Sequence, residues 1–409
     1  MKYIVIILIT LIPINIFPRN TKDNETTTGN DKKNEQKPYF NVSIRLHSDV
    51  IYDAKQMDPA WHACFRPSKI PVNPADPGWG TNGKTYFSVQ QTTFKFDGFL
   101  PVDHKWDKIK LHITFDLFGT GIHAGETVPR FRTGWGQWGP FLIGKEWSTF
   151  MDLGAFPNIY DWWGPSGMAL ASAPMIRYTN LLNDKNKLEL AVEFSGTGID
   201  PGQMRQIDPV LINFKTKEVL PDFISRYTYS GKWGYVNGAL LLRQLSYEIL
   251  SQQFETARAE HKFGWGFNFT SNFNFFKGNG ILKLQTVFGH GYAGYNSDGG
   301  VEITPDENYN ATVPFQYGFV VTYDHTFNRF LTSVTYSETK QNNSAGQLND
   351  AFHRSRYFVA QAIYQVIRNT LMTGLSYQYG MRINKNLDSA DDHRLVFAVR
   401  YMFNWSSKK

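Results

Sequence analysis

Apolar and polar residues alternate along most of the chain from Tyr39 onward. Between residues 108 and 119, one face carries Ile109, Leu111, Ile113, Phe115 and Leu117, and the other carries Lys110, His112, Thr114 and Asp116. A period of two predicts β-strands with one apolar and one polar face. The same alternation recurs at 188–195, 263–270, 315–323, 371–379 and 395–405.

Three features of these strands favour a membrane barrel over a soluble sandwich. The strands run for about ten residues or more, which is enough to cross a bilayer at a tilt. Their apolar faces end in Tyr, Trp and Phe, as interfacial aromatic girdles do. Their opposite faces are polar, whereas a sandwich needs a second apolar layer. Because a backbone in lipid cannot leave an open sheet edge, the strands must close into a barrel.

The pattern predicts an all-β fold, a 16-stranded antiparallel transmembrane β-barrel. A constriction loop folded into the lumen is a further hypothesis, which concerns residues 148–171. Sixteen strands make a porin-sized barrel, wide enough for an aqueous lumen. Long polar segments at 248–261 and 291–312 alternate with short turns, as extracellular loops alternate with periplasmic turns. The expected strands are 39–53, 84–98, 107–119, 129–138, 139–148, 172–182, 187–196, 222–230, 232–247, 262–275, 277–290, 313–325, 328–340, 355–366, 369–382 and 392–405.

Two segments that precede the first expected strand differ in composition from the rest of the chain. Residues 1–19 contain Lys2 followed by a short apolar run, which predicts a secretory signal peptide. Residues 20–38 hold almost no apolar side chains and predict a disordered polar segment. Residues 39–409 are expected to form the barrel. We expect this barrel to lie in the bacterial outer membrane, with outer-membrane lipid and the barrel-assembly machinery as partners.

Composition narrows the remaining chemistry. The net charge of +6 is spread along the chain, so no nucleic-acid footprint is indicated. The single cysteine, Cys64, excludes an internal disulfide framework and is expected to be a small buried residue. The ten histidines show no paired metal-ligand spacing. Acidic and amide residues gather in the 291–312 loop, and we expect a solvated loop there rather than a Ca²⁺ site. We expect no cofactor.

Residues 148–171 interrupt the alternation and combine Pro157 and Pro165 with several large aromatic residues. A long apolar segment of this kind is not expected to remain in water. It either folds into the barrel as a constriction, or packs over the barrel mouth or against another subunit. The residues alone leave these alternatives open.

The chain resembles the DcaP-like family of outer-membrane porins, and the stretch from 145 to 167 is the most specific part of the match. The resemblance implies a homotrimeric barrel that admits small anionic solutes, dicarboxylates among them. It is carried by AWHACFRPSKIP at 60–71, YFSVQQTTF at 86–94, FDLFGTG at 115–121, RFR at 130–132, GPFLIGKEWSTFMD at 139–152, DWWGPSG at 161–167 and GALLLRQLSYE at 238–248.

One position pair departs from that family. Where the family typically has two arginines in F-S-V-R-Q-S-R-F, this chain has Gln90 and Thr93. If those arginines line the pore, this pore is less basic at that point.

A pore selects ions by the charges that line its narrowest section. The period of two places a basic set inside the barrel, and Asp152 and Asp161 on the 148–171 segment are expected to face it and create a transverse field. The expected constriction residues are Lys110, Arg130, Arg132, Lys145, Arg177, Arg243, Asp152 and Asp161, and His112 and Arg226 are further lumen candidates.

These observations predict a non-enzymatic porin that passes small hydrophilic solutes, anionic and dicarboxylate-like, by diffusion. A homotrimer is expected, with the contact supplied by the first five strands, because Gly134, Gly136, Gly139 and Gly144 permit close packing. One alternative is an outer-membrane hydrolase with an outward Ser/His pair, disfavoured because the expected outward positions contain no His. Another is a structural or adhesive barrel with a plugged lumen.

Overall fold

The β-strands of this protein close into a barrel by antiparallel pairing of the first strand with the last. The computed structural model describes residues 37–80, 82–204, 212–251 and 257–408. The expected signal peptide 1–19 and all but the last two residues of the polar segment 20–38 lie outside the described residues. The barrel belongs to the unit Pro38–Lys409.

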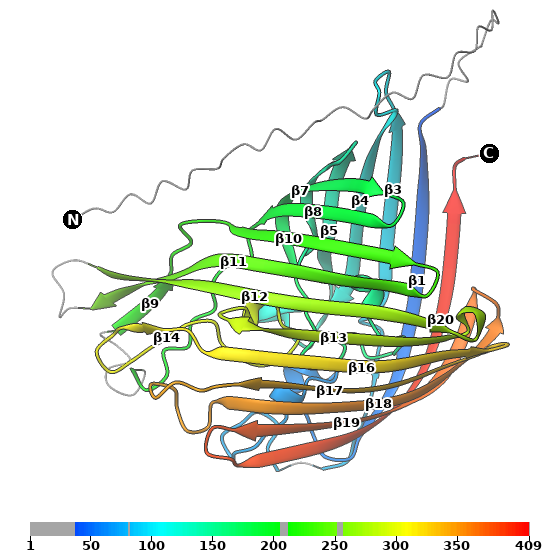
Figure 1. Ribbon diagram of the computed structural model, residues 1–409. Coiled ribbons are helices and arrows are strands. Elements are labelled where there is room, and N and C mark those ends of the chain that lie inside the picture. Colours follow the sequence, from blue (N-terminus) through cyan, green and yellow to red (C-terminus); the bar gives the residue numbers. More distant parts are fainter. Residues whose placement is uncertain (1–36, 81, 205–211, 252–256, 409) are drawn as a thin grey trace, which may run out of the picture. The chain divides into compact units, whose positions relative to one another are not determined.

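The main sheet contains 18 strand segments that make sixteen barrel strands (Figure 1). Two segments, β2 and β3, both pair with β1 and form one barrel strand, and β9 pairs only with the far end of β11. The barrel segments are β1 (Tyr39–Asp53), β2 (Lys84–Ser88), β3 (Thr93–Pro101), β4 (Lys108–Phe118), β5 (Thr127–Trp138), β6 (Phe141–Trp147), β7 (Ser172–Asn183), β8 (Asn186–Glu193), β10 (Asp222–Gly231), β11 (Gly234–Ser251), β12 (Arg258–Phe275), β13 (Gly280–His290), β16 (Phe315–Phe327), β17 (Phe330–Gln341), β18 (Phe352–Ile367), β19 (Leu371–Asn384) and β20 (Ser389–Ser406).

This architecture confirms the predicted sixteen-stranded antiparallel barrel, and each expected strand corresponds to one barrel strand. The closing pair runs from Asn41↔Ser406 to Asp53↔Arg394. The remaining segments are β9 (Ile212–Thr216) and a small separate hairpin of β14 (Thr304–Pro305) and β15 (Ala311–Thr312). Among the described residues, no helix is both long and apolar enough to cross a membrane.

The connections at the two ends of the barrel differ in length. Tight turns join β16 to β17 at Asn328 and β18 to β19 at Asn369, and these two residues have φ of 54° and 58°. Asn tolerates this left-handed conformation better than most residues. Long segments such as 54–83 and 148–171 leave the opposite end, which faces the lower left in Figure 1. That asymmetry identifies the long-loop end as the extracellular one.

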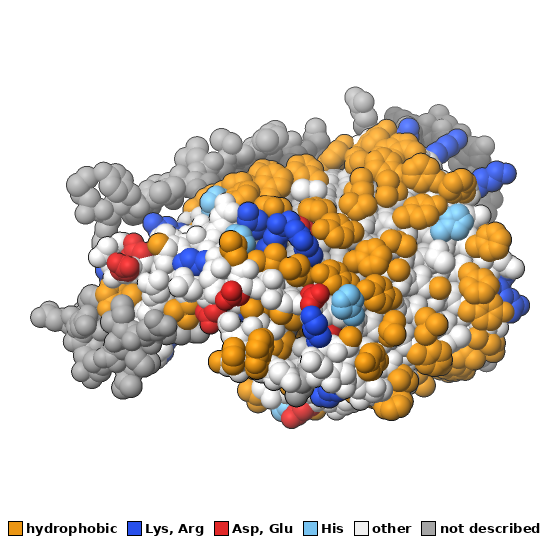
Figure 2. Space-filling view, turned by 90° about the horizontal axis from the view of Figure 1, so that it is seen from below, with side chains coloured by type: hydrophobic (Ala, Val, Ile, Leu, Met, Phe, Trp, Pro, Cys, Tyr) orange, Lys and Arg blue, Asp and Glu red, His pale blue; other side chains and the backbone are white. Residues whose placement is uncertain are grey.

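Apolar side chains cover the outer surface of the barrel (Figure 2). Leu375 on β19 is 65% exposed and Phe397 on β20 is 45% exposed, although both lie in the middle of paired strands. Their neighbours Ser376 and Val396 point inward and are buried. Within the part of the chain that the structure describes, no second protein layer covers these side chains, so the outer face is suited to lipid contact. The outward sets predicted from the alternation include Leu111, Ile113, Leu190, Phe263, Phe269, Leu375, Phe397, Tyr401, Phe403 and Trp405, all of which are exposed.

The core of the protein lies inside the barrel, where loops from the extracellular end pack on the inner wall. Phe150 of segment 148–171 packs with Leu241 of β11 and Val287 of β13. In the same way Phe65 of segment 54–83 packs with Tyr357 of β18. Cys64 is buried in this region, as expected.

The 291–312 loop is not the solvated loop that its composition predicted. Asp298 is 1% exposed and accepts hydrogen bonds from Arg66 Nε (3.2 Å) and Ser68 N (2.9 Å) of segment 54–83. Glu302 is 2% exposed and pairs with the buried Arg243. Carboxylates can be buried when they are paired and hydrogen-bonded, so these two fasten the loop instead of facing water. Within the described ranges, no group of three or more His, Cys, Asp or Glu could hold a metal ion.

We expect a charged side chain on the outer face to destabilise the barrel most when it lies within the lipid-facing belt. Replacing Leu375 by Arg places a guanidinium in the lipid-facing belt and should lower the free energy of unfolding in lipid vesicles by about 2–4 kcal/mol. Replacing Leu387 by Arg, in the exposed turn between β19 and β20, makes the same chemical change outside the belt. The second variant should cost about 1 kcal/mol or less. Equal losses in the two variants would contradict the assignment of the belt.

Candidate functional site

Segment 148–171 is bound along the inner wall by hydrogen bonds to its backbone. Asn268 of β12 donates to the Phe150 carbonyl (2.6 Å), and Lys283 of β13 donates to the Phe156 carbonyl (2.6 Å). Further along, the Tyr160 N–H donates to the Gln361 side chain of β18 (2.6 Å). Polar inward side chains thus satisfy backbone groups that would otherwise be buried without partners.

The segment makes its tightest approach to the wall at two glycines. A Cβ on Gly167 would lie 2.3 Å from the carbonyl oxygen of Glu338, and one on Gly318 would lie 2.5 Å from the Gly167 Cα. Gly167 also has a φ of 74°, a conformation that L-residues with side chains rarely adopt. Only glycine at both positions permits this contact between the segment and β16.

Asp152 fixes the first turn of the segment on the side of β11 and β12. Its carboxylate accepts from the Gly154 N–H (3.0 Å) and thereby caps the short helix η4 (Leu153–Ala155). It also accepts from the hydroxyls of Tyr235 (2.8 Å) and Thr270 (2.5 Å). This carboxylate therefore faces β11 and β12, and not the wall formed by β4 and β5.

Asp161 joins two segments inside the barrel. Its carboxylate accepts from the Phe65 N–H of segment 54–83 (3.0 Å) and from the Tyr357 hydroxyl of β18 (3.0 Å). Burial raises the pKa of Asp161 to about 6, although these hydrogen bonds and the charge of Arg394 act in the opposite direction. The residue acts as a joint between segments, and its carboxylate is not free to face a solute.

Three arginines on the inner wall are held by aromatic side chains of the segment. Arg45 and Arg132 both lie against the Trp162 ring, with their Cζ atoms 5.3 and 4.8 Å from its centroid. Arg400 lies over the Tyr160 ring at 5.0 Å. We call Arg45, Arg132 and Arg400 the arginine wall. Cation–π contacts of this kind orient a guanidinium without neutralising its charge.

A cavity inside the barrel opens beside the arginine wall and is edged by segment 148–171. Besides the three arginines it is lined by Lys95 and Lys110, so that five cations face three carboxylates. The carboxylates are those of Asp97, Glu146 and Asp161. Asp161 is bound as described above, and Asp97 is bound to His112 (2.7 Å). The cavity is therefore basic on balance.

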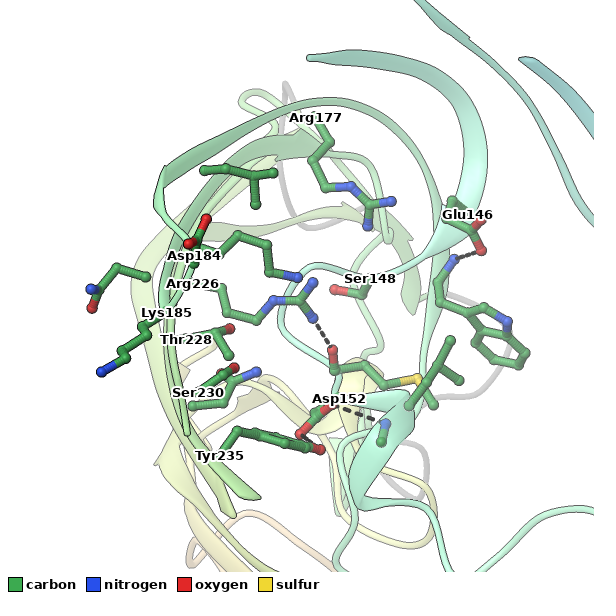
Figure 3. Close-up of a pocket in the computed structure, with 18 of the residues that line it drawn as sticks. Glu146, Ser148, Asp152, Arg177, Asp184, Lys185, Arg226, Thr228, Ser230 and Tyr235 are labelled. Carbon is green, nitrogen blue, oxygen red and sulfur yellow. Dashed lines mark hydrogen bonds between the residues drawn. The ribbon is translucent and has the colours of Figure 1, made fainter. Parts of the chain in front are cut away.

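A second cavity lies on the other side of the segment, where β7 and β10 supply basic side chains (Figure 3). Arg177 and Arg226 point into it, with Ser148 and Asp152 of the segment opposite. Arg226 donates to the Met151 carbonyl (2.5 Å) and pairs with Glu189 (2.7 Å between Nε and Oε2). Both cavities are bordered by Glu146, Trp147, Met151 and Leu153, so the segment separates them.

The expected constriction residues are divided among several places. Arg132 and Lys110 line the basic cavity, and Arg177 and Asp152 line the second cavity. Segment 148–171 divides the interior of the barrel into two cavities. The alternation along the strands predicts only that a side chain points inward, and not which cavity it reaches.

Two expected arginines are occupied by carboxylates. Arg130 binds Asp116 through two hydrogen bonds of 2.9 and 2.7 Å. Arg243 is buried between Asp222 and Glu302, and its side chain is only 1% exposed. These two arginines therefore hold the inner wall and its loops together.

Lys145 lies on the outer face and does not line either cavity. Its Nζ is 6.0 Å from the ring of Phe131, which is itself 45% exposed on the outside. The alternation along β6 agrees, because Phe141 and Ile143 are also exposed. Lys145 was expected at the constriction because it precedes segment 148–171 in the sequence. Its position in the alternation along β6 places it on the outer face instead.

Two members of the arginine wall were not among the expected constriction residues. Arg45 and Arg400 lie near opposite ends of the chain, on β1 and β20, which pair to close the barrel. Each alternates with outward apolar residues, so the period of two contained the signal. Their meeting with Arg132 depends on barrel closure and on Trp162, which no local pattern reveals.

One outward Ser/His pair exists despite the expectation of none. Ser246 Oγ lies 2.8 Å from His261 Nδ1 on the face of β11 and β12 that also carries Phe263. The Ser246 side chain is fully buried, and among the described residues no carboxylate is bonded to His261. A serine nucleophile needs an accessible hydroxyl and a base that a third group orients. The Ser246 hydroxyl is not accessible, and no described carboxylate orients His261.

Comparisons with known proteins place the fold among outer-membrane channels. No protein-family model matches the chain, and no curated protein matches it. Solved structures of porin-type barrels do match. An anion-selective porin from Comamonas acidovorans covers 90% of this chain and 100% of its own, with 8% identity and a TM-score of 0.57. OmpF of Salmonella typhi, solved with daunomycin, covers 89% and 97%, with 10% identity and a TM-score of 0.55.

The outer-membrane channel DcaP of Acinetobacter baumannii gives a TM-score of 0.73, covering 90% of this chain and 98% of its own at 17% identity. The protein thus has the fold of the DcaP channel, in agreement with the resemblance in its sequence. With its closed barrel and apolar outer belt, it is a protein of the bacterial outer membrane.

The joint at Asp161 generates a pH prediction. A carboxyl whose pKa is raised on folding binds more protons in the folded state, so its contribution to stability is complete below about pH 4 and is lost as the pH rises through about 6. Asn in place of Asp161 cannot ionise. The unfolding free energy of the native protein, minus that of Asp161→Asn, should fall between pH 4 and 7 by on the order of 2 kcal/mol. A pH-independent difference in vesicle unfolding would refute it.

Proposed function

We propose that this protein is a porin, a diffusion channel for small hydrophilic solutes with a preference for anions of the dicarboxylate type. The observation that carries the proposal is the arginine wall beside an open cavity within the barrel. A pore lined by fixed charges of one sign raises the local concentration of the opposite ion.

The magnitude of this effect is set by the number of charges that remain available. In a narrow lumen of reduced dielectric, each fixed positive charge gives an anion an advantage on the order of 1 kcal/mol. Guanidinium groups also match the planar carboxylate through paired N–H donors. Arg45 donates to Thr93 Oγ1 (2.8 Å) and Arg132 lies 3.3 Å from Asp116, which leaves further donors on both groups.

The departure at Gln90 and Thr93 does not remove the basic character of this region. Arg45, from the neighbouring barrel strand, reaches Thr93 and supplies a guanidinium beside it. Gln90 donates to the Glu126 carbonyl (2.7 Å). A positive charge on β1 therefore lies beside the position where the family typically has an arginine. This arrangement supports anion preference in this chain.

Segment 148–171 acts in this proposal as the constriction. It carries Trp162 and Tyr160 against the arginine wall and separates the two cavities. A solute passing through the basic cavity would move between the segment and β1, β4 and β5. The plugged structural barrel remains the alternative, and a measurable conductance separates it from a porin.

A homotrimer is part of the proposal, and Lys145 supports it. An ammonium group facing lipid is costly, and Lys145 lies on the outer face beside Phe131, whose ring covers Gly134 directly across the strand pair. A subunit contact through β3–β6 would cover this lysine. A structure of OmpT from Vibrio cholerae is described as a trimer form, with 10% identity to this chain and a TM-score of 0.53.

The pore prediction concerns charge removal at the arginine wall. Arg45→Ser and Arg132→Ser should each lower the anion-to-cation permeability ratio by roughly fivefold, the equivalent of about 1 kcal/mol. Conductance should rise slightly because the side chains become smaller. The measurement is the reversal potential of single channels across a salt gradient.

Arg329→Ser is the matched control, because Arg329 lies in the exposed turn between β16 and β17. It changes net charge equally and should leave the ratio unchanged. The double variant Arg130→Ser with Arg132→Ser leaves Asp116 without either of its arginines and should lower the ratio further than Arg132→Ser alone. An unchanged ratio in both Arg45→Ser and Arg132→Ser would place ion selection elsewhere.

The assembly prediction uses Lys145. The native protein should have the mass of a trimer in mild detergent. Lys145→Glu reverses the charge at the proposed contact and should shift the protein toward monomers, whereas Lys277→Glu, in the tight turn between β12 and β13, should not. A monomeric native protein, measured by light scattering, would count against the trimer and leave the pore proposal standing.

A further inference from the structure

A second basic cluster lies on the outside of the barrel, at the extracellular ends of β17 and β18. It consists of Lys340, Arg354 and Arg356 with one carboxylate, Glu338, and we call it the outer cluster. The alternation places these residues on the same face as Val334 and Tyr336, which are exposed in the apolar belt. Viewed from below Figure 1, blue side chains gather on this surface toward the long-loop end, with hydrophobic side chains beyond them (Figure 2).

Among the described residues, the cluster has three positive charges, and its ion pairs are made with one carboxylate, that of Glu338. Glu338 is directly opposite Arg356 across the strand pair and also binds Arg354. Lys340 is directly opposite Arg354, so two like charges face each other at a distance of about 5 Å between their Cβ atoms. Such a pair is destabilising unless an anion lies between its members.

The arginines retain unused hydrogen-bond donors. Arg354 Nε and Arg356 Nε are buried and have no hydrogen-bond partner among the described residues, although Arg356 Nε lies 3.5 Å from Glu338 Oε2. Their side chains are 30% and 40% exposed, whereas Glu338 is 5% exposed. Each guanidinium presents five N–H donors in a fork that fits two oxygens of a phosphate. The two guanidinium side chains are therefore partly exposed on the outer face, whereas the carboxylate is buried.

The position of the outer cluster relative to the membrane indicates which molecule binds it. The cluster lies above the belt at the extracellular end, where the headgroups of the outer leaflet meet the barrel. An outward surface in that position faces lipid rather than solute, and basic clusters at headgroup level recognise phosphorylated lipids. We infer that the outer cluster is a binding site for the phosphate groups of a glycolipid in the outer leaflet, of the lipid A type.

The test uses the full-length protein, purified and freed of lipid in mild detergent, and titrated with bis-phosphorylated lipid A or with the same glycolipid after its phosphates are removed. The native protein should bind the phosphorylated form at least about tenfold more tightly. The double variant Lys340→Gln with Arg356→Gln keeps the Arg354–Glu338 pair and should lose most of that preference. Arg368→Gln, in the turn at the other end of β18, is the matched control and should bind as the native protein does.

Glu338→Gln provides a measurement in the opposite direction. It removes the one carboxylate of the cluster and should tighten binding of the phosphorylated form, so the inference stays testable even if the double variant folds poorly. Equal binding of the two glycolipids by the native protein would overturn the inference. So would unchanged binding in the folded double variant, or its dissociation into monomers with unchanged lipid binding, because that result would assign the cluster to a subunit contact.

Discussion

The pairing of β1 with β20 is the interaction on which the rest of this structure depends. In lipid, every N–H and C=O of a spanning strand must find a partner within the protein. An open sheet would expose the edges of β1 and β20 to hydrocarbon, whereas closure satisfies both. Closure also brings Arg45 and Arg400, which are far apart in the sequence, onto one stretch of inner wall. The same requirement that makes the barrel stable therefore assembles its basic site.

Closure creates an interior too wide for the inward side chains to fill, and the extracellular loops occupy part of it. Segments 54–83, 148–171 and 291–312 pack there on buried apolar residues and on paired charges such as Arg66 with Asp298. The charges consumed in this way, including Arg243, cannot act on a solute. The cations that still border a cavity include the arginine wall, whose guanidinium groups lie against aromatic rings, with one further contact between Arg132 and Asp116.

Charge on the two faces of the barrel serves different surroundings. Inside, the arginine wall borders a cavity and is suited to a passing anion. Outside, the outer cluster lies at headgroup level above an apolar belt and is suited to a lipid phosphate that does not move through the pore. Both arrangements use guanidinium donors, and the parity of the strand decides which surroundings each arginine meets.

The period-two pattern of the sequence was sufficient for the number of strands, their approximate bounds and the face on which most side chains lie. These are local properties, because each strand alternates independently of its neighbours. The apolar, Pro-bearing character of 148–171 also showed that this segment was not an ordinary loop. Arg132 and Lys110, which the same alternation places on the inner face, line the basic cavity.

Only the tertiary structure decided which of the inward charges remain free. Arg130 and Arg243 look like Arg132 in the sequence. Arg130, however, forms two hydrogen bonds with Asp116 and Arg243 is enclosed by Asp222 and Glu302, whereas Arg132 makes a single longer contact with Asp116. Asp298 and Glu302 appeared solvated until the 291–312 loop was seen inside the barrel. The reason is physical: whether a charge is paired depends on what lies across from it in space, and closure and loop packing determine that neighbour at sequence separations that no local pattern spans.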